Sequence, residues 1–298
     1  MLKNKKACFA LLARNCRNAL AQNLLRIERF SLIFKEIFIV IVENDSTDGT
    51  KEFLCEMQKC KQNFFIITCD SENNSSFMKK AGGIERIEKM AFYRNQYLNF
   101  IKNFDFYETI DYLIVIDSDI KYFSEQGVIS ALENAPTDWT ALFANGRYYF
   151  DLLNITILGR YYDLFAFVPH KDCGVSNLNT NLTYREMALC ADLLTNRKLK
   201  KVRYMKCLSA FGGIGIYKIK AIRDGKYDTR VNERSNVFDA VCEHVNLNLT
   251  CTLHGNNYIS ADMLVCYEKS LRSILSKIVP IKLKIFIYET LTNKTFPH

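Results

Sequence analysis

The sequence predicts an α/β protein whose central sheet is mostly parallel and flanked by helices. Apolar runs alternate with amphipathic stretches in the first half of the chain, in the order strand, helix, strand, helix, strand. Two of the apolar runs stop at polar clusters, over 43–50 and 117–119. With 298 residues, of which 49% are hydrophobic and 24% charged, the chain can bury a substantial core. This composition excludes a disordered or fibrous chain.

The expected elements follow from the spacing of the apolar residues. We expect strands over 7–13, 37–42, 64–68 and 112–116, and helices over 15–30, 50–59 and 84–104. The polar turn that precedes the second helix offers side chains for its N-cap. The second half is less regular, with many Phe and Tyr residues over 140–170. Ligands of such sheets bind beyond the carboxyl ends of the strands, where both polar clusters are expected.

Cysteine usage and charge bear on the compartment and on the partners. The eleven cysteines are odd in number and irregularly spaced, which is not a disulfide framework, so we interpret them as reduced thiols of a cytoplasmic protein. The apolar run 7–13 is too short for a secretory signal, and no segment reaches the roughly 18 apolar residues of a membrane span. The formal net charge of +8 at pH 7 suits anionic partners such as nucleotides, phospholipids or nucleic acid.

The sharpest local feature is Asp117-Ser118-Asp119, which directly follows an apolar run. In an extended chain, residues two apart point to the same side, so the two carboxylates repel each other unless a cation lies between them. Carboxylate oxygens suit Mg²⁺ or Mn²⁺, and these ions usually keep substrate phosphates in their shell. The alternative is that both aspartates are solvated turn residues. Their position at the end of a predicted strand favours the metal site.

The second polar cluster, together with the first, gives the sequence a family resemblance. Val42 to Thr50 reads Val-Glu-Asn-Asp-Ser-Thr-Asp-Gly-Thr, and Ile116 to Asp119 reads Ile-Asp-Ser-Asp. This pairing resembles the nucleotide-sugar glycosyltransferases of the GT-A fold, in particular family-2-like members with a Val-Asp-Asp-Gly-Ser-Thr-Asp-Gly-Thr type segment. Glu43 and Asn44 replace the two leading aspartates, and Asp45 replaces the glycine. The resemblance covers most of residues 5–265.

The resemblance implies roles for these residues. Glu43, with Asp45 beside it, would approach the base or ribose of a nucleotide. Asp117, Ser118 and Asp119 would lie at the ribose and at the metal-bound diphosphate. A late histidine completes the metal shell in many such enzymes, and His244 or His254 would take that place here. The implied cofactors are Mn²⁺ or Mg²⁺ and a UDP- or GDP-sugar donor.

A more distant likeness is to fungal capsule-associated α-mannosyltransferases. It depends on short motifs that occur in the right order over about residues 86–245. They are the segment from Arg86 to Asn95, Tyr161-Tyr162-Asp163 with the later Lys171-Asp172, Phe211-Gly212-Gly213, and Cys242-Glu243-His244.

Two of these motifs suggest contacts with a donor. Arg86 and Arg94 are two turns apart on one predicted helix, so both can lean towards one edge. A guanidinium matches the oxygens of a diphosphate, and Arg94 is the preferred candidate; the alternative is a solvated, salt-bridged helix face. Gly212 and Gly213 would let the backbone approach a sugar closely, or would only form a tight bend.

The last motif suggests a catalytic base. Glu243 offers a carboxylate that can take a proton from an acceptor hydroxyl. Asp163 and Asp172 lie in the expected acceptor region and are lesser candidates.

These observations predict a metal-dependent glycosyltransferase that moves a hexose from a UDP- or GDP-sugar to a glycan or lipid-linked acceptor. Two alternatives stay open: a nucleotidyltransferase-like enzyme that also handles phosphates, and a basic nucleic-acid-binding or scaffold protein. The expected domain is 1–266, with a nucleotide-sugar-binding half over about 1–120 and an acceptor half over about 121–266.

The tail, residues 267–298, combines apolar residues at helical spacing with an excess of lysine and arginine. A basic amphipathic helix can lie in the headgroup layer of an anionic membrane, which would place the enzyme on the cytoplasmic face. The alternative is that the tail packs back on the domain.

Overall fold

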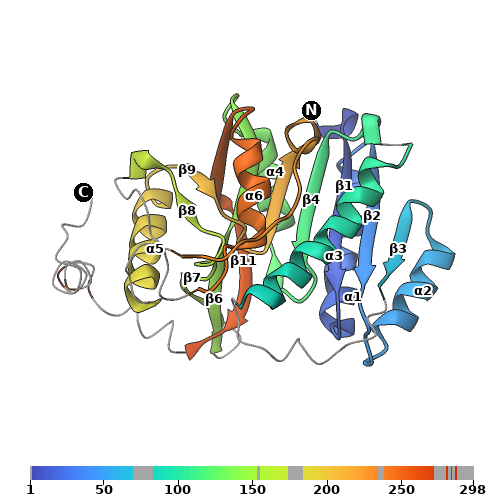
Figure 1. Ribbon diagram of the computed structural model, residues 1–298, viewed down its shortest axis with the longest axis horizontal. Coiled ribbons are helices and arrows are strands. Elements are labelled where there is room, and N and C mark those ends of the chain that lie inside the picture. The colour runs from blue at the N-terminus through green and yellow to red at the C-terminus, as the bar shows by residue number, and fades with distance from the viewer. Residues whose placement is uncertain are drawn as a thin grey trace.

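The computed structural model describes residues 2–69, 83–105, 107–152, 155–173, 184–233 and 238–271, with single positions at 280, 283 and 286. Within these residues the strands form one sheet of eleven strands, flanked by helices (Figure 1). The order of the hydrogen-bonded strands is β3-β2-β1-β4-β10-β6-β11-β9-β8, while β5 pairs with β11 and β7 pairs with β6. The predicted α/β fold is confirmed.

The first half of the sheet is parallel. It contains β1 (Lys6–Ala13), β2 (Glu36–Glu43), β3 (Phe64–Thr68) and β4 (Tyr112–Asp117). The connecting helices are α1 (Arg17–Glu28), α2 (Thr50–Cys60) and α3 (Ile84–Lys102). All seven elements agree with the expected ranges to within about two residues, because each has a strong apolar pattern of its own. The N-cap of α2 is Gly49, and Asp48 Oδ1 accepts a hydrogen bond from the Thr50 N–H.

The second half of the sheet is mixed. β10 (Ile214–Lys218) runs antiparallel to both β4 and β6, whereas the two longest strands, β6 and β11, are parallel to each other. The other strands are β5 (Tyr122–Phe123), β6 (Trp139–Leu152), β7 (Ile155–Tyr161), β8 (Val168–Pro169), β9 (Tyr204–Ser209) and β11 (Asn256–Lys269). The helices here are α4 (Glu125–Glu133), α5 (Tyr184–Leu199) and α6 (Glu243–Cys251).

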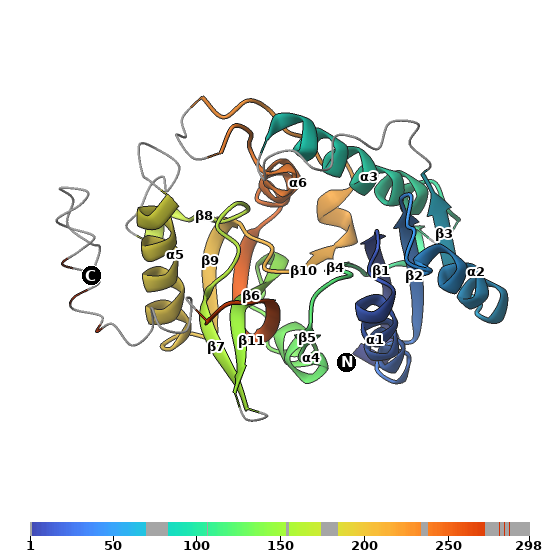
Figure 2. The same ribbon diagram turned by 90° about the horizontal axis from the view of Figure 1, so that it is seen from below.

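Helices cover both faces of the sheet, and each face has its own hydrophobic core. Buried residues of α3, α5 and α6 form one cluster with the sheet, and those of α1, α2 and α4 form the other. Figure 2 shows α3 and α6 on one side and α1 and α4 on the opposite side. The sheet is therefore buried on both faces, as is usual for parallel strands joined by helices.

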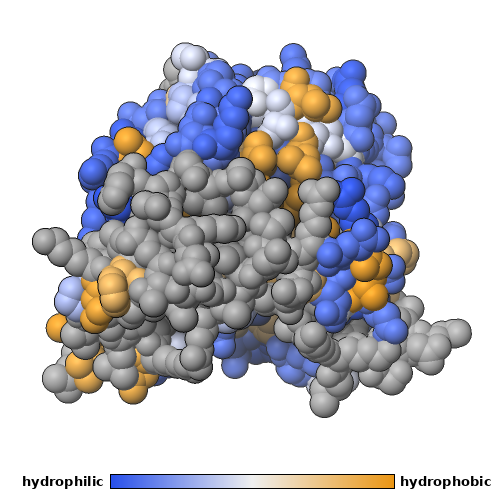
Figure 3. All heavy atoms as spheres, turned by 60° about the vertical axis from the view of Figure 1, so that its left-hand side comes forward, coloured by the Kyte–Doolittle hydropathy of each residue, from blue (hydrophilic) through white to orange (hydrophobic). Residues whose placement is uncertain are grey.

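The predicted boundary at residue 266 falls inside β11, which continues to Lys269. Tyr267 is thus part of the sheet rather than of a separate tail. Most of the predicted basic tail lies outside the described residues, so its helix and its membrane contact stay predictions. Within the part of the chain that is described, no helix is both long and apolar enough to cross a bilayer. On the face in Figure 3, hydrophobic residues lie in small groups among hydrophilic ones.

Candidate active site

The carboxyl ends of β1, β2 and β4 meet at one edge of the sheet. Ala13 pairs with Glu43, and Leu12 pairs with Asp117. The residues just after these positions surround a cavity of about 220 Å³, which we name the strand-end cavity. Its charged and amide-bearing lining residues, with Ser118, are Arg14, Asn44, Arg86, Arg94, Asp117 and Asp119. Both polar clusters that the sequence analysis selected contribute to this cavity.

A second and larger cavity, of about 340 Å³, lies over the second half of the sheet. We name it the aromatic cavity because its walls include Tyr148, Tyr162, Phe165, Phe211, Phe238 and Tyr267. Its ionisable lining residues include Asp163, Glu243, His244 and Glu268. The two cavities share Arg86, Met90, Arg94, Asp117 and Tyr267, so they adjoin along this group.

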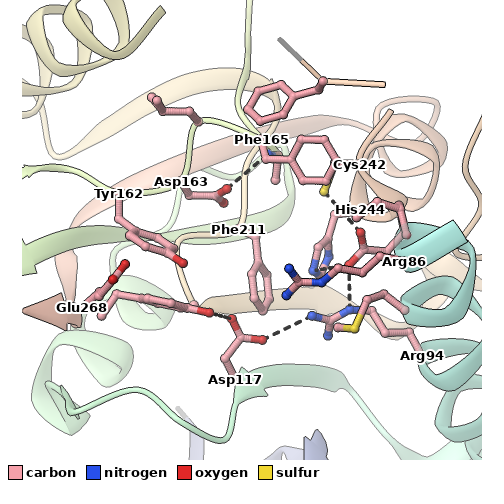
Figure 4. A pocket seen from close by; sticks show the side chains of 18 of the residues that line it. Arg86, Arg94, Asp117, Tyr162, Asp163, Phe165, Phe211, Cys242, His244 and Glu268 are labelled. Carbon is pink, nitrogen blue, oxygen red and sulfur yellow. Dashed lines mark hydrogen bonds and ion pairs between the residues drawn. The ribbon is translucent and has the colours of Figure 1, made fainter. Parts of the chain in front are cut away.

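Arg94 lies at the junction of the two cavities and joins residues of both (Figure 4). Its Nε donates to Glu243 Oε1 at 3.0 Å, and its Nη2 donates to Asp117 Oδ1 at 3.2 Å. The residue is only 4% exposed. Burial alone would lower the pKa of Arg94, but its interactions with Tyr97, Asp117 and Glu243 raise that pKa well above its usual value. Arg94 is therefore a permanent buried cation held between two carboxylates.

Asp117 is held on both of its carboxylate oxygens. Arg94 donates to Oδ1, and the Tyr267 hydroxyl donates to Oδ2 at 2.9 Å. Burial raises the pKa of Asp117 to about 7, and the nearby charge of Asp119 adds to the rise, while Arg94 opposes it. With this raised pKa the group titrates close to neutral pH, and a further positive charge nearby would favour its ionised form.

Asp119 projects into the strand-end cavity and is exposed. It accepts no hydrogen bond from another described side chain. Desolvation in the cleft raises the pKa of Asp119. Between the two aspartates, Ser118 is buried, and its hydroxyl donates to the backbone oxygen of Leu12 at 2.5 Å. The serine therefore ties the motif to β1, and the two carboxylates are left to face the cavity.

The donor set fits a divalent cation that is shared with a phosphate ligand. Within the described ranges, no group of three or more His, Cys, Asp and Glu side chains could hold a metal ion on its own. Mg²⁺ and similar ions, however, are usually held by one or two carboxylates together with substrate phosphates. Asp117 and Asp119 match that pattern, because they line one cavity and because a cation there would relieve the cost of desolvating two like charges.

The two candidate histidines lie differently with respect to these aspartates: His244 lines a cavity with Asp117 but not with Asp119, and His254 lines a cavity with neither. His244 lines the aromatic cavity, stacked on Phe211 with a ring-centroid distance of 4.0 Å. His254 is exposed in the turn after α6, at the opposite end of that helix from Glu243, and it lines neither cavity. Neither histidine lines the strand-end cavity, where Asp119 lies.

Glu43 lies beneath the turn rather than in a cavity. It is fully buried, and its Oε1 accepts a hydrogen bond from the Ser46 N–H at 2.7 Å. The residue that lines the strand-end cavity is Asn44, which the sequence analysis did not select. Asp45, at φ 48°, accepts a hydrogen bond from the Asn44 side chain at 3.0 Å. Both acidic residues shape the turn. The Asn44 NH2 group also donates to the Cys69 backbone oxygen, so its Oδ1 is the atom left for a ligand in the cavity.

Most of the remaining sequence candidates lie at the aromatic cavity, and Asp172 does not. Arg86 lines both cavities and makes no hydrogen bond or ion pair with another described residue.

Gly212 and Gly213 adopt φ values of 64° and 91°, and Gly213 lines the aromatic cavity. Asp163 lines the same cavity and accepts hydrogen bonds from the backbone N–H groups of Gly212 and Ala166. Asp172 lies on a short 3-10 helix, forms an ion pair with His170, and does not line the aromatic cavity.

Sequence reasoning missed the aromatic side of the site. Tyr267 was assigned to the tail, yet it binds Asp117 and stacks on Tyr162 with a ring-centroid distance of 3.7 Å. Glu268, the next residue, also lines the aromatic cavity. The available signals were the motifs that contain Tyr162 and Phe211 and the excess of Phe and Tyr over 140–170, none of which points to Tyr267 or Glu268.

No family model matches the chain, and no curated protein matches it. Among solved structures, the chain is similar to the mannosyltransferase PcManGT from Pyrobaculum calidifontis in complex with GDP-Man and Mn²⁺, with a TM-score of 0.47 and 11% identity. That similarity covers 99% of this chain and 66% of the other. The chain is also similar to S. aureus TarS 1-349 in complex with UDP-GlcNAc, with a TM-score of 0.45, 13% identity, and coverage of 98% and 68%.

The chain spans about two thirds of the PcManGT chain and 40% of another TarS chain. At these TM-scores the likeness does not carry the functional case, which depends on the cavities and their residues.

Proposed function

We propose that this protein is a metal-dependent glycosyltransferase that moves a hexose from a UDP- or GDP-sugar to a glycan or lipid-linked acceptor. The observation that carries the proposal is the junction of two cavities at Arg94 and Asp117. One cavity has the charged lining that a nucleoside diphosphate needs, and the other has the aromatic lining that suits a sugar. A transferase needs two such sites that meet where the bond is exchanged.

The donor would occupy the strand-end cavity. Its place beyond the carboxyl ends of β1, β2 and β4 is where open α/β sheets bind their ligands. Arg86, which has no partner among the described residues, offers a guanidinium to the diphosphate, and Asn44 offers its side-chain carbonyl oxygen to the nucleoside. The base of the nucleotide would be selected by such contacts.

Asp117 and Asp119 would hold the cation. When bound, the ion would supply positive charge that stabilises the diphosphate leaving group. Arg94 contributes a second, permanent positive charge close to the same place. In the transfer, the bond from the sugar carbon to the phosphate oxygen breaks, and a bond from that carbon to the acceptor oxygen forms.

The acceptor hydroxyl must also lose its proton. Two carboxylates of the aromatic cavity are candidate bases, Glu243 and Asp163. Glu243 is buried, and both of its carboxylate oxygens already have partners, since Oε1 accepts a hydrogen bond from Arg94 and Oε2 accepts one from the Cys242 thiol. Desolvation raises the pKa of Asp163, although the backbone N–H groups of Gly212 and Ala166 oppose the rise, and a carboxylate with a raised pKa is a stronger base. We therefore assign the base role to Asp163, and we assign Glu243 to the positioning of Arg94.

The experiment is a measurement of nucleoside diphosphate release from a panel of UDP-, GDP- and CMP-sugars, with and without Mn²⁺. We expect release from a UDP- or GDP-sugar that depends on the metal and increases when an acceptor is added. Release of pyrophosphate from a nucleoside triphosphate would indicate a nucleotidyltransferase instead. Absence of any turnover or nucleotide binding over the whole panel would contradict the proposal.

A further inference from the structure

The aromatic cavity has three properties that together select a chemical class of ligand: aromatic walls, an unpartnered buried imidazole, and a surplus of negative charge. We propose that the aromatic cavity binds an uncharged sugar ring, with His244 as its hydrogen-bond partner, and that it discriminates against acidic sugars. This inference rests on the proposed function, in which the ring belongs to the acceptor.

The walls favour a sugar ring. Tyr162 and Tyr267 stack nearly parallel, at 21° and with their centroids 3.7 Å apart, and Phe165 and Phe238 form a second pair at 4.7 Å. Aromatic faces carry partial negative charge, and the C–H bonds on one face of a pyranose are apolar and slightly positive. The ring faces that are not covered within these pairs can pack on one face of a sugar and leave its hydroxyl groups for polar partners.

His244 makes no hydrogen bond with its side chain among the described residues, although its Nε2 lies 3.7 Å from Glu243 Oε1. It is 3% exposed, and neither of its ring nitrogens has a hydrogen-bond partner among the described residues. Phe211 covers one face of its ring, and Tyr227 meets it edge to face at 5.4 Å. Unpartnered buried nitrogens are costly, so a ligand that bonds to one of them is favoured. Figure 4 shows the ring beside Phe211, at the wall of the cavity.

A hydroxyl group suits this imidazole better than an anion does. Burial, with Arg94 nearby, lowers the pKa of His244 well below its usual value, so the ring is neutral. A neutral imidazole has one donating and one accepting nitrogen, and a sugar hydroxyl can serve either of them. A carboxylate or phosphate can only accept, so it matches only one nitrogen and one tautomer.

The charge of the aromatic cavity also favours an uncharged sugar. Its described lining holds two arginines, Arg86 and Arg94, against four carboxylates: Asp117, Asp163, Glu243 and Glu268. Arg94 is already bound to two of these carboxylates. Arg86 also lines the strand-end cavity, where a donor diphosphate would engage it. A uronate or a phosphorylated sugar would therefore meet uncompensated negative charge, whereas a neutral hexose would not.

The test is a ligand-observed NMR titration of the full chain, with UDP or GDP present to occupy the strand-end cavity. The ligands are methyl hexopyranosides and the matched methyl hexopyranosiduronates, which differ only in the carboxylate. We expect at least one hexoside to bind and its uronate to bind about tenfold more weakly or worse. Equal or tighter binding of the uronate, or no binding of any hexoside, would overturn the proposal.

A pair of histidine variants tests the role of His244. His244→Phe keeps an aromatic ring against Phe211 and removes both nitrogens, so we expect hexoside binding to weaken about 3- to 10-fold. His254→Phe is the matched control outside both cavities and should bind as the unmodified chain does. His244→Gln restores a donor and an acceptor and should recover most of the loss. Unchanged affinity in a folded His244→Phe variant would contradict the role of His244.

Nucleotide release, measured separately, keeps the two proposals apart. If hexosides bind selectively but no nucleotide sugar is cleaved, the glycosyltransferase proposal fails and the sugar site stands. If a nucleotide sugar is cleaved but no hexoside binds, the transferase proposal stands and the sugar site fails.

Discussion

The strand-end cavity and the aromatic cavity adjoin, yet they are built in opposite ways. The polar lining of the strand-end cavity comes largely from residues that directly follow β1, β2 and β4, so neighbouring strands bring them together by register. The aromatic cavity collects side chains from β6, β11, α6 and loops that are far apart in sequence. The comparison teaches that local chain geometry positions the charged side chains suited to a diphosphate. The shape of a cavity suited to a sugar depends instead on the whole second half of the sheet.

The largest expected effect lies in the aromatic cavity. Asp163→Asn keeps the shape of the side chain and removes its basicity, so turnover should fall about 10²- to 10⁴-fold with little change in donor affinity. Glu243→Gln should cost less turnover, because Glu243 positions Arg94 instead of taking the proton. Steady-state kinetics measure the loss of turnover in each of the two variants. The reverse order of losses would assign the base role to Glu243.

The same residue gives a pH dependence. Desolvation raises the pKa of Asp163 in the folded chain above its ordinary value of 3.8. Transfer should therefore increase as the pH rises through this raised pKa, because the base must be ionised. Stability should change in the opposite direction, since the folded state binds this proton more tightly than the unfolded state and loses that advantage as the pH rises from about 4. Urea unfolding at several pH values should show that the free energy of unfolding falls less with rising pH in Asp163→Asn than in the unmodified chain.

The next effect follows from removing the Arg94 guanidinium at the junction of the two cavities. Arg94→Met leaves Asp117 and Glu243 as buried carboxylates without their cation, so the free energy of unfolding should fall by about 3–5 kcal/mol. Arg203→Met is the matched control, because its ion pair with Asp262 is partly exposed and should be worth less than about 1 kcal/mol. Chemical denaturation measures both variants. Equal losses would mean that Arg94 is not the strong link between the cavities.

A smaller loss is expected in the strand-end cavity. Asp119→Ala should lower turnover about 10²- to 10³-fold through lost stabilisation of the leaving diphosphate. The melting temperature should stay constant or rise slightly, because the repulsion between Asp117 and Asp119 is relieved. Asp228→Ala, a carboxylate outside both cavities, is the control. Full activity of Asp119→Ala in a metal-dependent assay would remove this residue from the metal site.

The smallest effect concerns the two glycines beneath the aromatic cavity. A methyl group on Gly213 would meet side chains that can shift, the nearest being Val265 Cγ1 at 3.1 Å, so Gly213→Ala should cost about 1–2 kcal/mol of stability. A methyl group on Gly212 would meet the backbone oxygen of Ala144 at 2.3 Å, which cannot move away. Gly212→Ala should therefore be the more damaging change in thermal denaturation, and the opposite order would contradict this account of the backbone.

The sequence predicted the first half of the molecule well. The seven elements of that half and the place of Asp117 and Asp119 at a strand end follow from apolar runs and the polar residues that stop them. Even there, the residue expected to contact the nucleotide was displaced by one position. Glu43 is buried under the turn, and its neighbour Asn44 lines the cavity. Successive residues at a strand end point to opposite sides, and no pattern in the sequence fixed which of the two would face the ligand.

The second half could not be predicted in the same way. Arg94 reaches Glu243 across 149 positions of sequence, and Tyr267 reaches Asp117 across 150. Such contacts depend on the insertion of β10 antiparallel between β4 and β6 and on the long pairing of β6 with β11. No local periodicity encodes these pairings, so the sequence indicated an aromatic region without indicating a cavity.

The most direct measurement of the central claim is isothermal titration calorimetry of UDP and GDP, with and without Mn²⁺, on the unmodified chain and on Asp119→Asn. We expect one of the two nucleotides to bind, and its affinity to rise when Mn²⁺ is present. In Asp119→Asn, we expect the gain from Mn²⁺ to be lost while metal-free binding, supported by Arg86 and Asn44, is retained. Binding that is absent for both nucleotides, or an Mn²⁺ effect that is equal in the two proteins, would contradict a metal-assisted diphosphate site in the strand-end cavity.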